Sequence, residues 1–195
     1  MYKGTSASAG IGIGKAVIVE EVRLVIAMQA VTDVEEEVQR FKGALDETIK
    51  ATEKLAEDLA TRVGEKEAEI MQGHMMLLAD PMLTGEIENS VRNDGVNSEY
   101  AIENVCNMYA DMFASMGDEL MQQRATDMRD IKTRMQQMLM GIQSVDISSL
   151  PEGSIIVAKD LTPSMTAGIN PAKVTGIVTE LGGKTSHSAI LARAL

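Results

Sequence analysis

The stretch that decides the fold is residues 174–195, VTGIVTELGGKTSHSAILARAL. It begins with the β-branched run 174–179, which is typical of a strand, and it ends in an apolar pattern with helical spacing. The order strand, short loop, helix is the repeating unit of an α/β fold. We expect the helix to begin near Thr185 or Ser186, which places His187 in its first turn.

The loop before this helix has the composition of a phosphate-binding site. Gly182 and Gly183 permit close backbone approach. Lys184, Thr185 and Ser186 add a positive charge and two hydroxyls. The unpaired N–H groups and the dipole of a helix N-terminus favour an anion at the same place. These five residues are the predicted phosphate-binding residues.

His187 is one of two histidines in the chain and is the candidate catalytic residue. A neutral imidazole nitrogen is a nucleophile near pH 7, and its attack on a phosphoryl group gives a phosphoramidate that can pass the group on. A histidine on an apolar helix stripe is also common as a packed residue, and two glycines are common in a plain tight turn. From these residues alone, phosphoryl transfer and a structural role both remain open.

The remainder of the chain divides into two kinds of sequence. Residues 1–31 and 144–195 contain 9 of the 16 glycines and further β-branched runs at 15–19, 22–26 and 154–158. Residues 32–143 contain 12 of the 15 methionines, 23 acidic residues and 11 basic residues. This predicts an α/β domain formed by 1–31 and 144–195, incomplete at its C-terminus, that is interrupted by a helical domain over 32–143.

Several start and stop signals predict an antiparallel helical bundle in the middle segment. Thr32 and Glu35 have the spacing of a capping box, and Gly64 ends or bends the first long helix. A second helix is expected over 66–79. Asp80-Pro81 is expected to begin a third helix, and Ser98 to cap a fourth that extends to about Met116. A fifth helix is expected over 128–142.

Composition excludes several functional classes. The net charge of −11 and an aromatic content of 3% argue against nucleic-acid binding. The single cysteine, Cys106, fits a reducing cytoplasm and is expected to be buried, and one cysteine with two histidines leaves little for a zinc site. No apolar run reaches the ~20 residues of a membrane span.

Five segments of the chain carry a family resemblance. Residues 182–193, GGKTSHSAILAR, resemble the phosphohistidine signature of phosphoenolpyruvate-utilising enzymes. The other four, in chain order, are GTSASAGIGIGK (4–15), GHMMLLADP (73–81), RATDMRDI (124–131) and DLTPS (160–164). Together they resemble enzyme I of the bacterial phosphoenolpyruvate:sugar phosphotransferase system.

The resemblance implies a role for several residues. His187 would take phosphate from phosphoenolpyruvate and pass it to a histidine of the small carrier protein HPr, and Thr166 would orient the imidazole. The family usually has arginine where this chain has Lys184, and lysine lacks the bidentate fork of arginine. The fold implied is a swivelling β/β/α phosphohistidine domain interrupted by an HPr-binding helical domain. The family's phosphoenolpyruvate-binding barrel, with its Mg²⁺ site and dimer interface, would follow Leu195, so this chain is expected to be a monomeric N-terminal fragment.

The same resemblance implies that HPr docks on residues 65–83. Methionine adapts its shape to a partner, and acidic groups attract a basic carrier. Charges at this spacing are also usual on a solvated face, and methionines are usual in cores. The predicted partner-binding residues are Glu65, Glu67, Glu69, Met71, His74, Met75, Met76, Asp80, Met82 and Leu83.

Two other functions remain open from the sequence. A dikinase or phosphoenolpyruvate synthase also carries a phosphohistidine domain, although the helical segment and the 73–81 motif argue against both enzymes. A non-catalytic helical adaptor would use the glycine loop only as a turn.

Overall fold

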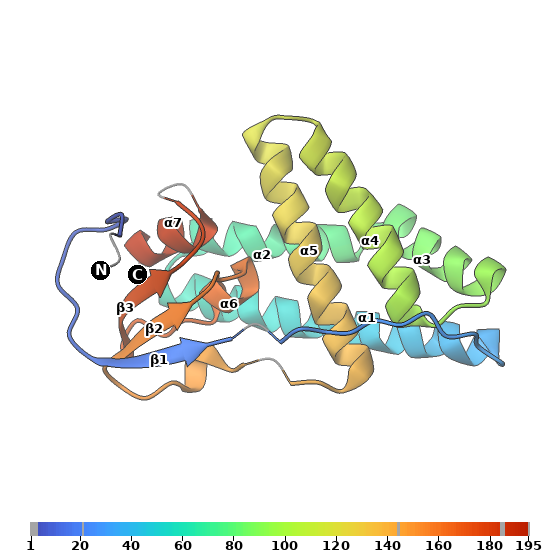
Figure 1. Cartoon of the computed structure of the whole chain (residues 1–195), viewed down its shortest axis with the longest axis horizontal. Coiled ribbons are helices and arrows are strands. Elements are labelled where there is room, and N and C mark those ends of the chain that lie inside the picture. The colour runs from blue at the N-terminus through green and yellow to red at the C-terminus, as the bar shows by residue number, and fades with distance from the viewer. Residues whose placement is uncertain (1–3, 21, 144, 184–185, 195) are drawn as a thin grey trace. The chain divides into compact units, whose positions relative to one another are not determined.

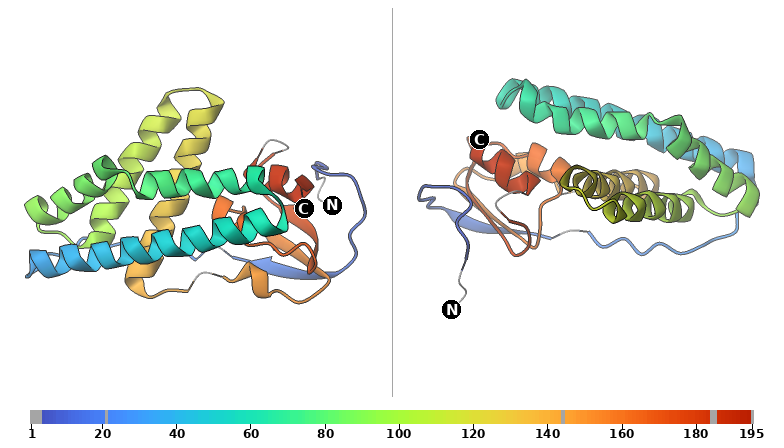
Figure 2. Two further views of the ribbon diagram at one scale, coloured as in Figure 1. Left: turned by 180° about the vertical axis from the view of Figure 1, so that it is seen from behind. Right: turned by 90° about the horizontal axis from the view of Figure 1, so that it is seen from above.

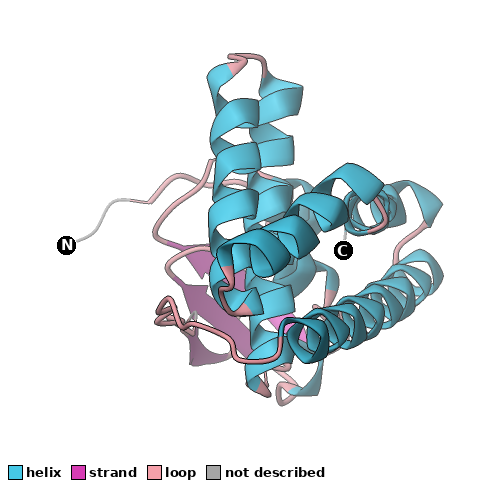
Figure 3. Cartoon of the chain, turned by 90° about the vertical axis from the view of Figure 1, so that its right-hand side faces the viewer, coloured by secondary structure: helices cyan, strands magenta, loops and turns pink. Residues whose placement is uncertain are grey.

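One small parallel sheet and a larger set of helices make up the computed structural model of the chain (Figures 1 and 3). The structure describes residues 4–20, 22–143, 145–183 and 186–194, without the side chains of 187, 188, 191 and 194. Within the described residues, no helix is both long enough and apolar enough to cross a membrane.

The sheet contains β1 (Lys15–Val19), β2 (Ser154–Ala158) and β3 (Val174–Thr179), in the order β1-β2-β3 with all neighbours parallel. These are three of the four β-branched runs, so the strand prediction is confirmed for them. Branched side chains fit a pleated surface, and Ile156 of β2 pairs with residues of that kind on both sides.

The segment before β1 has to be rich in glycine. A Cβ added at Gly12 would collide with the backbone oxygen of Thr175, and one added at Gly14 would collide with that of Gly153. The segment therefore lies directly on the backbone at the amino ends of β2 and β3, and only glycine permits this approach.

One face of the sheet is buried against a short helical turn and a short helix. The turn η1 (Ile147–Ser149) precedes β2, and the helix α6 (Pro163–Ala167) connects β2 to β3. Lys173, just before β3, donates from Nζ to the carbonyl of Ser148 at 3.1 Å. The buried core between these elements consists of Val19, Ile147, Leu150, Ile156, Ala158, Leu161 and Ile169.

The predicted strand at Val22–Ile26 is wrong. These residues form no ladder with any described strand, and Val25 is exposed. The chain instead makes one isolated antiparallel bridge between Ala30 and Val96. The β-branched composition was present, but the segment leads into the helices, where no neighbouring strand can complete its hydrogen bonds.

Five helices follow: α1 (Val34–Arg62), α2 (Glu65–Leu78), α3 (Pro81–Asp94), α4 (Ser98–Ser115) and α5 (Glu119–Met140). Helices α4 and α5 run antiparallel side by side (Figure 2). One core with residues from all five of these helices includes large, fully buried side chains, among them Phe41, Leu78, Ile87, Ile102, Met128, Ile131 and Met135. Cys106 is buried in this core, as predicted.

The helix start signals were correct in part. Asp80 caps α3 by accepting the N–H of Met82 at 2.8 Å, and Pro81 is the first helical residue, as predicted. At α1 the capping residue is Asp33, which accepts the N–H of Glu36, and the predicted Thr32 box is wrong. At α4 the N-cap position is Asn97, without a side-chain capping bond, and Ser98 already belongs to the helix.

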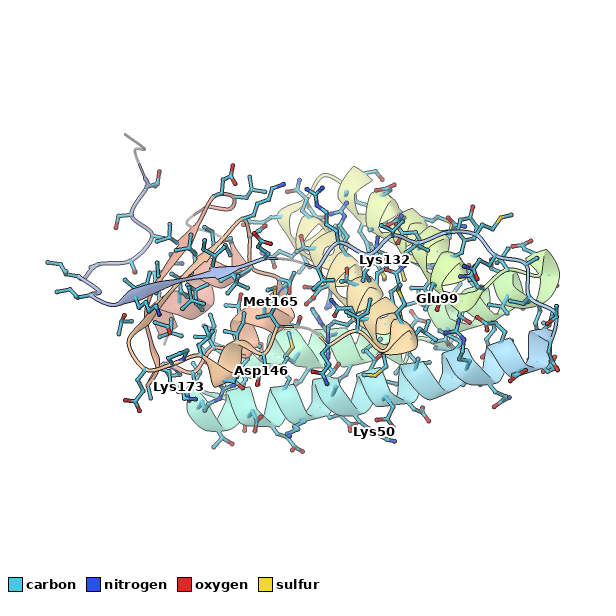
Figure 4. All side chains as sticks on the ribbon, turned by 60° about the horizontal axis from the view of Figure 1, so that its bottom comes forward. Lys50, Glu99, Lys132, Asp146, Met165 and Lys173 are labelled. Carbon is cyan, nitrogen blue, oxygen red and sulfur yellow. The ribbon has the colours of Figure 1, made fainter. Side chains whose placement is uncertain are left out.

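Glu37 of α1 replaces the missing cap of α4. Its Oε1 accepts the backbone N–H of Ser98 at 2.6 Å, and its carboxylate is paired with Arg40. Arg40 also binds Glu99, the next residue of α4, at 2.7 Å. Figure 4 labels Glu99 on α4 and Lys132 on α5. The cap and its ion pairs join two helices far apart in sequence.

The chain divides into two compact units. The first unit contains residues 1–22, 55–69 and 145–195, and the second contains 23–54 and 70–144. Residues 55–69, which are the last turns of α1 and the first turn of α2, group with the sheet. Arg62 in this segment binds the carbonyls of Ala167, the last residue of α6, and of Ile169.

We predict that Glu37→Gln lowers the free energy of unfolding by about 2 kcal/mol, the usual scale for losing hydrogen bonds to a charged group. Burial alone would raise the pKa of Glu37, but the hydrogen bonds from Arg40 and Ser98 outweigh it and lower this pKa from 4.5 to about 2. The folded-state pKa is lower than the unfolded one, so the stabilisation is present above pH 4.5 and is lost as the pH falls toward 2. Denaturant unfolding at several pH values measures both effects.

The matched control is Glu47→Gln. Glu47 lies on the same helix, pairs with Lys50, and is 60% exposed, so its loss should change the free energy of unfolding by less than ~0.5 kcal/mol. Equal destabilisation by the two substitutions would contradict the capping role of Glu37.

Candidate functional site

The loop that carries the predicted phosphate-binding residues leaves the carboxyl end of β3. Two backbone hydrogen bonds hold its first residues beside the chain that follows β2: Glu180 N–H to the Ala158 carbonyl at 3.1 Å and Leu181 N–H to the Lys159 carbonyl at 2.8 Å. Open α/β sheets bind ligands beyond the carboxyl ends of their parallel strands. The loop therefore lies at the edge of the sheet where such sites form.

Helix α7 (His187–Ala194) begins at the residue that the sequence singled out. The hydroxyl of Ser186 accepts the N–H of Ala189 at 3.2 Å and donates to the Gly183 carbonyl at 2.9 Å. Ser186 is thus the N-cap, and His187 is the first residue of the helix. The prediction that His187 lies in the first turn is confirmed for its backbone.

Gly182 has a backbone conformation that glycine adopts without strain. Its φ is +95°, and a Cβ there would lie 3.4 Å from the Ser186 hydroxyl and 3.9 Å from Oδ1 of Asp160. Gly183 is exposed, and its carbonyl closes the turn through Ser186. The structure therefore brings Gly182, Gly183 and Ser186 together.

The remaining predicted residues of the loop lie outside the described part of the chain. This applies to Lys184 and Thr185 entirely, and to the side chain of His187. Their predicted roles in binding phosphate and accepting the phosphoryl group stay predictions.

Thr166 lies in α6, which contacts α7 (Figure 1). The side chain of Thr166 is buried, and its hydroxyl donates to the Thr162 carbonyl at 2.9 Å. A hydroxyl oxygen has two lone pairs, so that of Thr166 can still accept a hydrogen bond. Thr162 caps α6 by accepting the N–H of Met165, a residue labelled in Figure 4. The predicted orientation of the His187 imidazole by Thr166 stays a prediction.

The predicted partner-binding residues divide into exposed and buried ones. Met76 is 72% exposed and Met82 is 67% exposed. Glu65 and Glu69 are exposed, and half-buried positions are occupied by Glu67, Met75 and Asp80. Of these, Asp80 has a second use as the cap of α3.

Three of the predicted partner-binding residues are buried. Met71 and Leu83 are core residues, and His74 is fully buried inside the helical unit. Methionine and leucine on the inward face of an amphipathic helix fill the core. None of the three can contact a partner through its side chain in this structure.

His74 lies between two buried carboxylates of α5. Its Nε2 is 3.3 Å from Oδ1 of Asp127, and its Nδ1 is 3.9 Å from Oδ2 of Asp130. Arg124 approaches Asp127 at 3.8 Å. Burial lowers the pKa of Arg134, and the charge of Asp130 opposes this shift. The cluster is a buried polar contact between α2 and α5.

Sequence reasoning missed an exposed methionine row on α4. Met108 and Met112 on this helix and Met116 directly after it are exposed at a spacing of four residues. Burial raises the pKa of the neighbouring Tyr109, and the carboxylates of Glu86 and Asp80 raise it further, so acidic groups of α3 lie beside this part of α4. The four-residue spacing of these methionines can be read from the sequence. It does not predict whether this face of α4 packs against another helix or is exposed to solvent.

Comparison with known proteins gives the family. The model of the N-terminal part of PEP-utilising enzymes matches residues 3–124, and that of their mobile domain matches residues 150–195. The chain belongs to the family of PEP-utilising enzymes. The first match alone covers more than half of the chain, and the second includes α6, the glycine loop and α7.

Curated relatives of the chain are named phosphoenolpyruvate-protein phosphotransferase. The protein of Listeria monocytogenes is 42% identical over 99% of this chain, and that of Bacillus subtilis is 41% identical over the same share. The chain covers 34% of either relative, so it spans about one third of their length.

Two solved structures resemble the chain. The NMR solution structure of an Enzyme I protein has a TM-score of 0.86 and 38% identity, and the match covers 100% of this chain and 79% of that one. A structure of the N-terminal domain of Enzyme 1 - Nitrogen has a TM-score of 0.68 and 26% identity, with 96% and 77% covered. The resemblance to enzyme I noted from the motifs is therefore confirmed.

We predict that Ser186→Ala destabilises the first turn of α7 by about 1 kcal/mol, because the helix loses its N-cap. Ser186→Asp retains an oxygen acceptor and should preserve this turn. Amide hydrogen exchange at Ala189 and Ile190 reports the opening of the turn. Unchanged exchange in Ser186→Ala would show that this serine is not the cap.

Proposed function

We propose that this chain is the phosphoryl-relay part of a phosphoenolpyruvate-protein phosphotransferase, the enzyme I of a sugar phosphotransferase system. One observation carries the proposal: His187 is the first residue of a capped helix, four residues after Gly183, at the carboxyl edge of a parallel sheet. The name of the relatives and the motifs of this chain support the same activity. They favour it over the dikinase and adaptor hypotheses.

The reaction proposed at His187 has two transfers. A lone pair of an imidazole nitrogen attacks the phosphorus of phosphoenolpyruvate, the bond from phosphorus to the enol oxygen breaks, and enolpyruvate leaves. In the second transfer, an imidazole nitrogen of HPr attacks the same phosphorus, the P–N bond to His187 breaks, and the neutral imidazole is restored. Such transfers depend mainly on positioning and on charge stabilisation.

The helix N-terminus supports the charge stabilisation. Its backbone N–H groups and dipole favour a transferring phosphoryl group near His187. Gly182 and Gly183 allow the backbone to approach the group closely, and Lys184 and Thr185 would supply a positive charge and a hydroxyl. The family usually has arginine where this chain has Lys184. A lysine ammonium would attract the phosphate through its single charge and could not form the two parallel hydrogen bonds of an arginine guanidinium.

Thr166 is proposed to orient the imidazole. Its hydroxyl hydrogen is used on the Thr162 carbonyl. The role left for the hydroxyl oxygen is therefore to accept an imidazole N–H, which selects the tautomer whose other nitrogen is free to attack. The burial of Thr166 supports a fixed orientation.

The proposed partner is HPr, docking on exposed residues of α2 and the start of α3. Met76 and Met82 offer apolar contact area, and Asp80 lies between them in sequence. Glu65, Glu67 and Glu69 add acidic charge to the first turns of α2. Complementary charge steers the encounter with a basic carrier.

Loading from phosphoenolpyruvate is proposed to need the rest of the full-length protein. The relatives are about three times as long as this chain. The Mg²⁺ and the dimer interface of the full-length family are proposed to belong to that additional part. Among the described residues no three His, Cys, Asp or Glu side chains form a group that could hold a metal ion. A cytoplasmic location is proposed for the same enzyme.

We predict that phospho-HPr labels this chain at one acid-labile site and that His187→Ala abolishes the label. His74→Gln should retain it, because His74 is buried away from solvent. Phosphoenolpyruvate alone should not label the chain. Labelling that survives in His187→Ala would remove this histidine from the mechanism.

We predict that Met76→Lys and Met82→Lys each weaken HPr binding about tenfold, which corresponds to ~1.4 kcal/mol. Each removes apolar contact and places a positive charge opposite a basic carrier. Isothermal titration calorimetry measures the dissociation constant. Met140→Lys, at the exposed end of α5, is the control and should bind as the unsubstituted chain does. If all three variants bind equally, HPr docks elsewhere.

A further inference from the structure

The guanidinium of Arg62 is engaged on all three nitrogens. Nε donates to the Asp58 carbonyl at 3.1 Å, Nη1 to the Ile169 carbonyl at 2.6 Å, and Nη2 to the Ala167 carbonyl at 2.9 Å. Within the part of the chain that the structure describes, it forms no ion pair with a carboxylate. Its positive charge is directed at backbone carbonyls.

These carbonyls are at the ends of two helices. Asp58 lies in the last turn of α1, Ala167 is the last residue of α6, and Ile169 lies two residues further on. The last carbonyls of a helix have no partner within it, and a cation there is favourable. Ala167 and Ile169 are buried, so water does not readily replace the guanidinium.

Helix α6 depends on outside contacts for its position. It has only five residues, which is too short to be stable by its own hydrogen bonds. Pro163 and the Thr162 cap define its beginning, and Arg62 binds the carbonyls at its end. The two-pronged bond from one rigid, planar group restrains both the place and the direction of α6.

The position of α6 matters for the site because α6 carries Thr166 and contacts α7. Thr166 directly precedes Ala167, the residue whose carbonyl Nη2 binds. A shift of α6 therefore moves the Thr166 hydroxyl and the surface on which α7 rests. Displacements of about 1 Å can reduce a reaction rate up to ~100-fold.

We infer that Arg62 is a positioning residue for phosphoryl transfer at His187: it holds the C-terminal end of α6 and so keeps Thr166 aligned with the start of α7. The inference rests on the proposed function of His187. Arg62 acts through α6 and does not touch the reacting atoms. The paired Nη atoms of the guanidinium matter as well as its charge, because a lysine ammonium can bind only one of the two carbonyls in the same geometry.

The test compares Arg62→Ala and Arg62→Lys with the unsubstituted chain. Single-turnover transfer from phospho-HPr should be slowed about tenfold in Arg62→Ala and by an intermediate factor in Arg62→Lys. The dissociation constant for HPr should stay the same in both. The ¹⁵N spectrum of the His187 imidazole should show an altered tautomer population or titration. Arg92→Ala, which removes a partly exposed arginine paired with Glu35 and Glu88, is the control and should leave the rate unchanged.

The outcomes separate the two proposals. If the unsubstituted chain is not labelled, the proposed function fails. If it is labelled and both Arg62 variants react at the same rate with the same imidazole spectrum, the positioning role is overturned. A variant that is only less stable, with normal transfer by its folded fraction, also overturns it. If Arg62→Ala does not fold, Arg62→Lys decides: a normal rate contradicts the inference and a reduced rate supports it.

Discussion

The parallel pairing of β1 with β2 is the constraint on which the rest of the structure depends. Parallel neighbours cannot be joined by a tight turn, so the chain has to leave the carboxyl end of β1 and return to the amino end of β2. Here residues 20–153 make this crossover, and the described part of this range includes α1 to α5. Because all three strands run the same way, the segments after β2 and β3 begin at one edge of the sheet. That common edge is why α6, the glycine loop and α7 are neighbours.

Within the helical unit, polar groups are satisfied between helices as well as within them. Glu37 caps α4 from α1, and Arg40 joins the two helices through a second carboxylate. Asp127 and Asp130 of α5 flank His74 of α2. A buried charge without a partner is costly, so each of these contacts restricts which helix faces can meet. In the sheet unit, Arg62 does the same for the end of α6.

Local signals at two helix starts were predictable because the interaction lies within a few residues, whereas at α1 the cap is Asp33 and not the predicted Thr32. The start of α3 at Asp80-Pro81 and the start of α7 were predicted correctly, because cap and helix are adjacent in sequence. Predictions failed where a distant group decided the outcome. Ser98 resembles a cap, but Glu37, 61 residues away, takes that role. Met71, His74 and Leu83 had the composition of a partner surface, and the fold buries them.

The sequence by itself determined the strand–loop–helix order around His187, the helical nature of the middle segment and the family, because each of these depends on residues that are adjacent in the sequence. Only the tertiary structure decided which methionines are exposed, that His74 is internal, that residues 55–69 group with the sheet, and that Arg62 binds the end of α6. The physical reason is that burial and long-range hydrogen bonding depend on which faces pack together. Which faces pack together depends on the whole chain and is not predicted by any local sequence pattern.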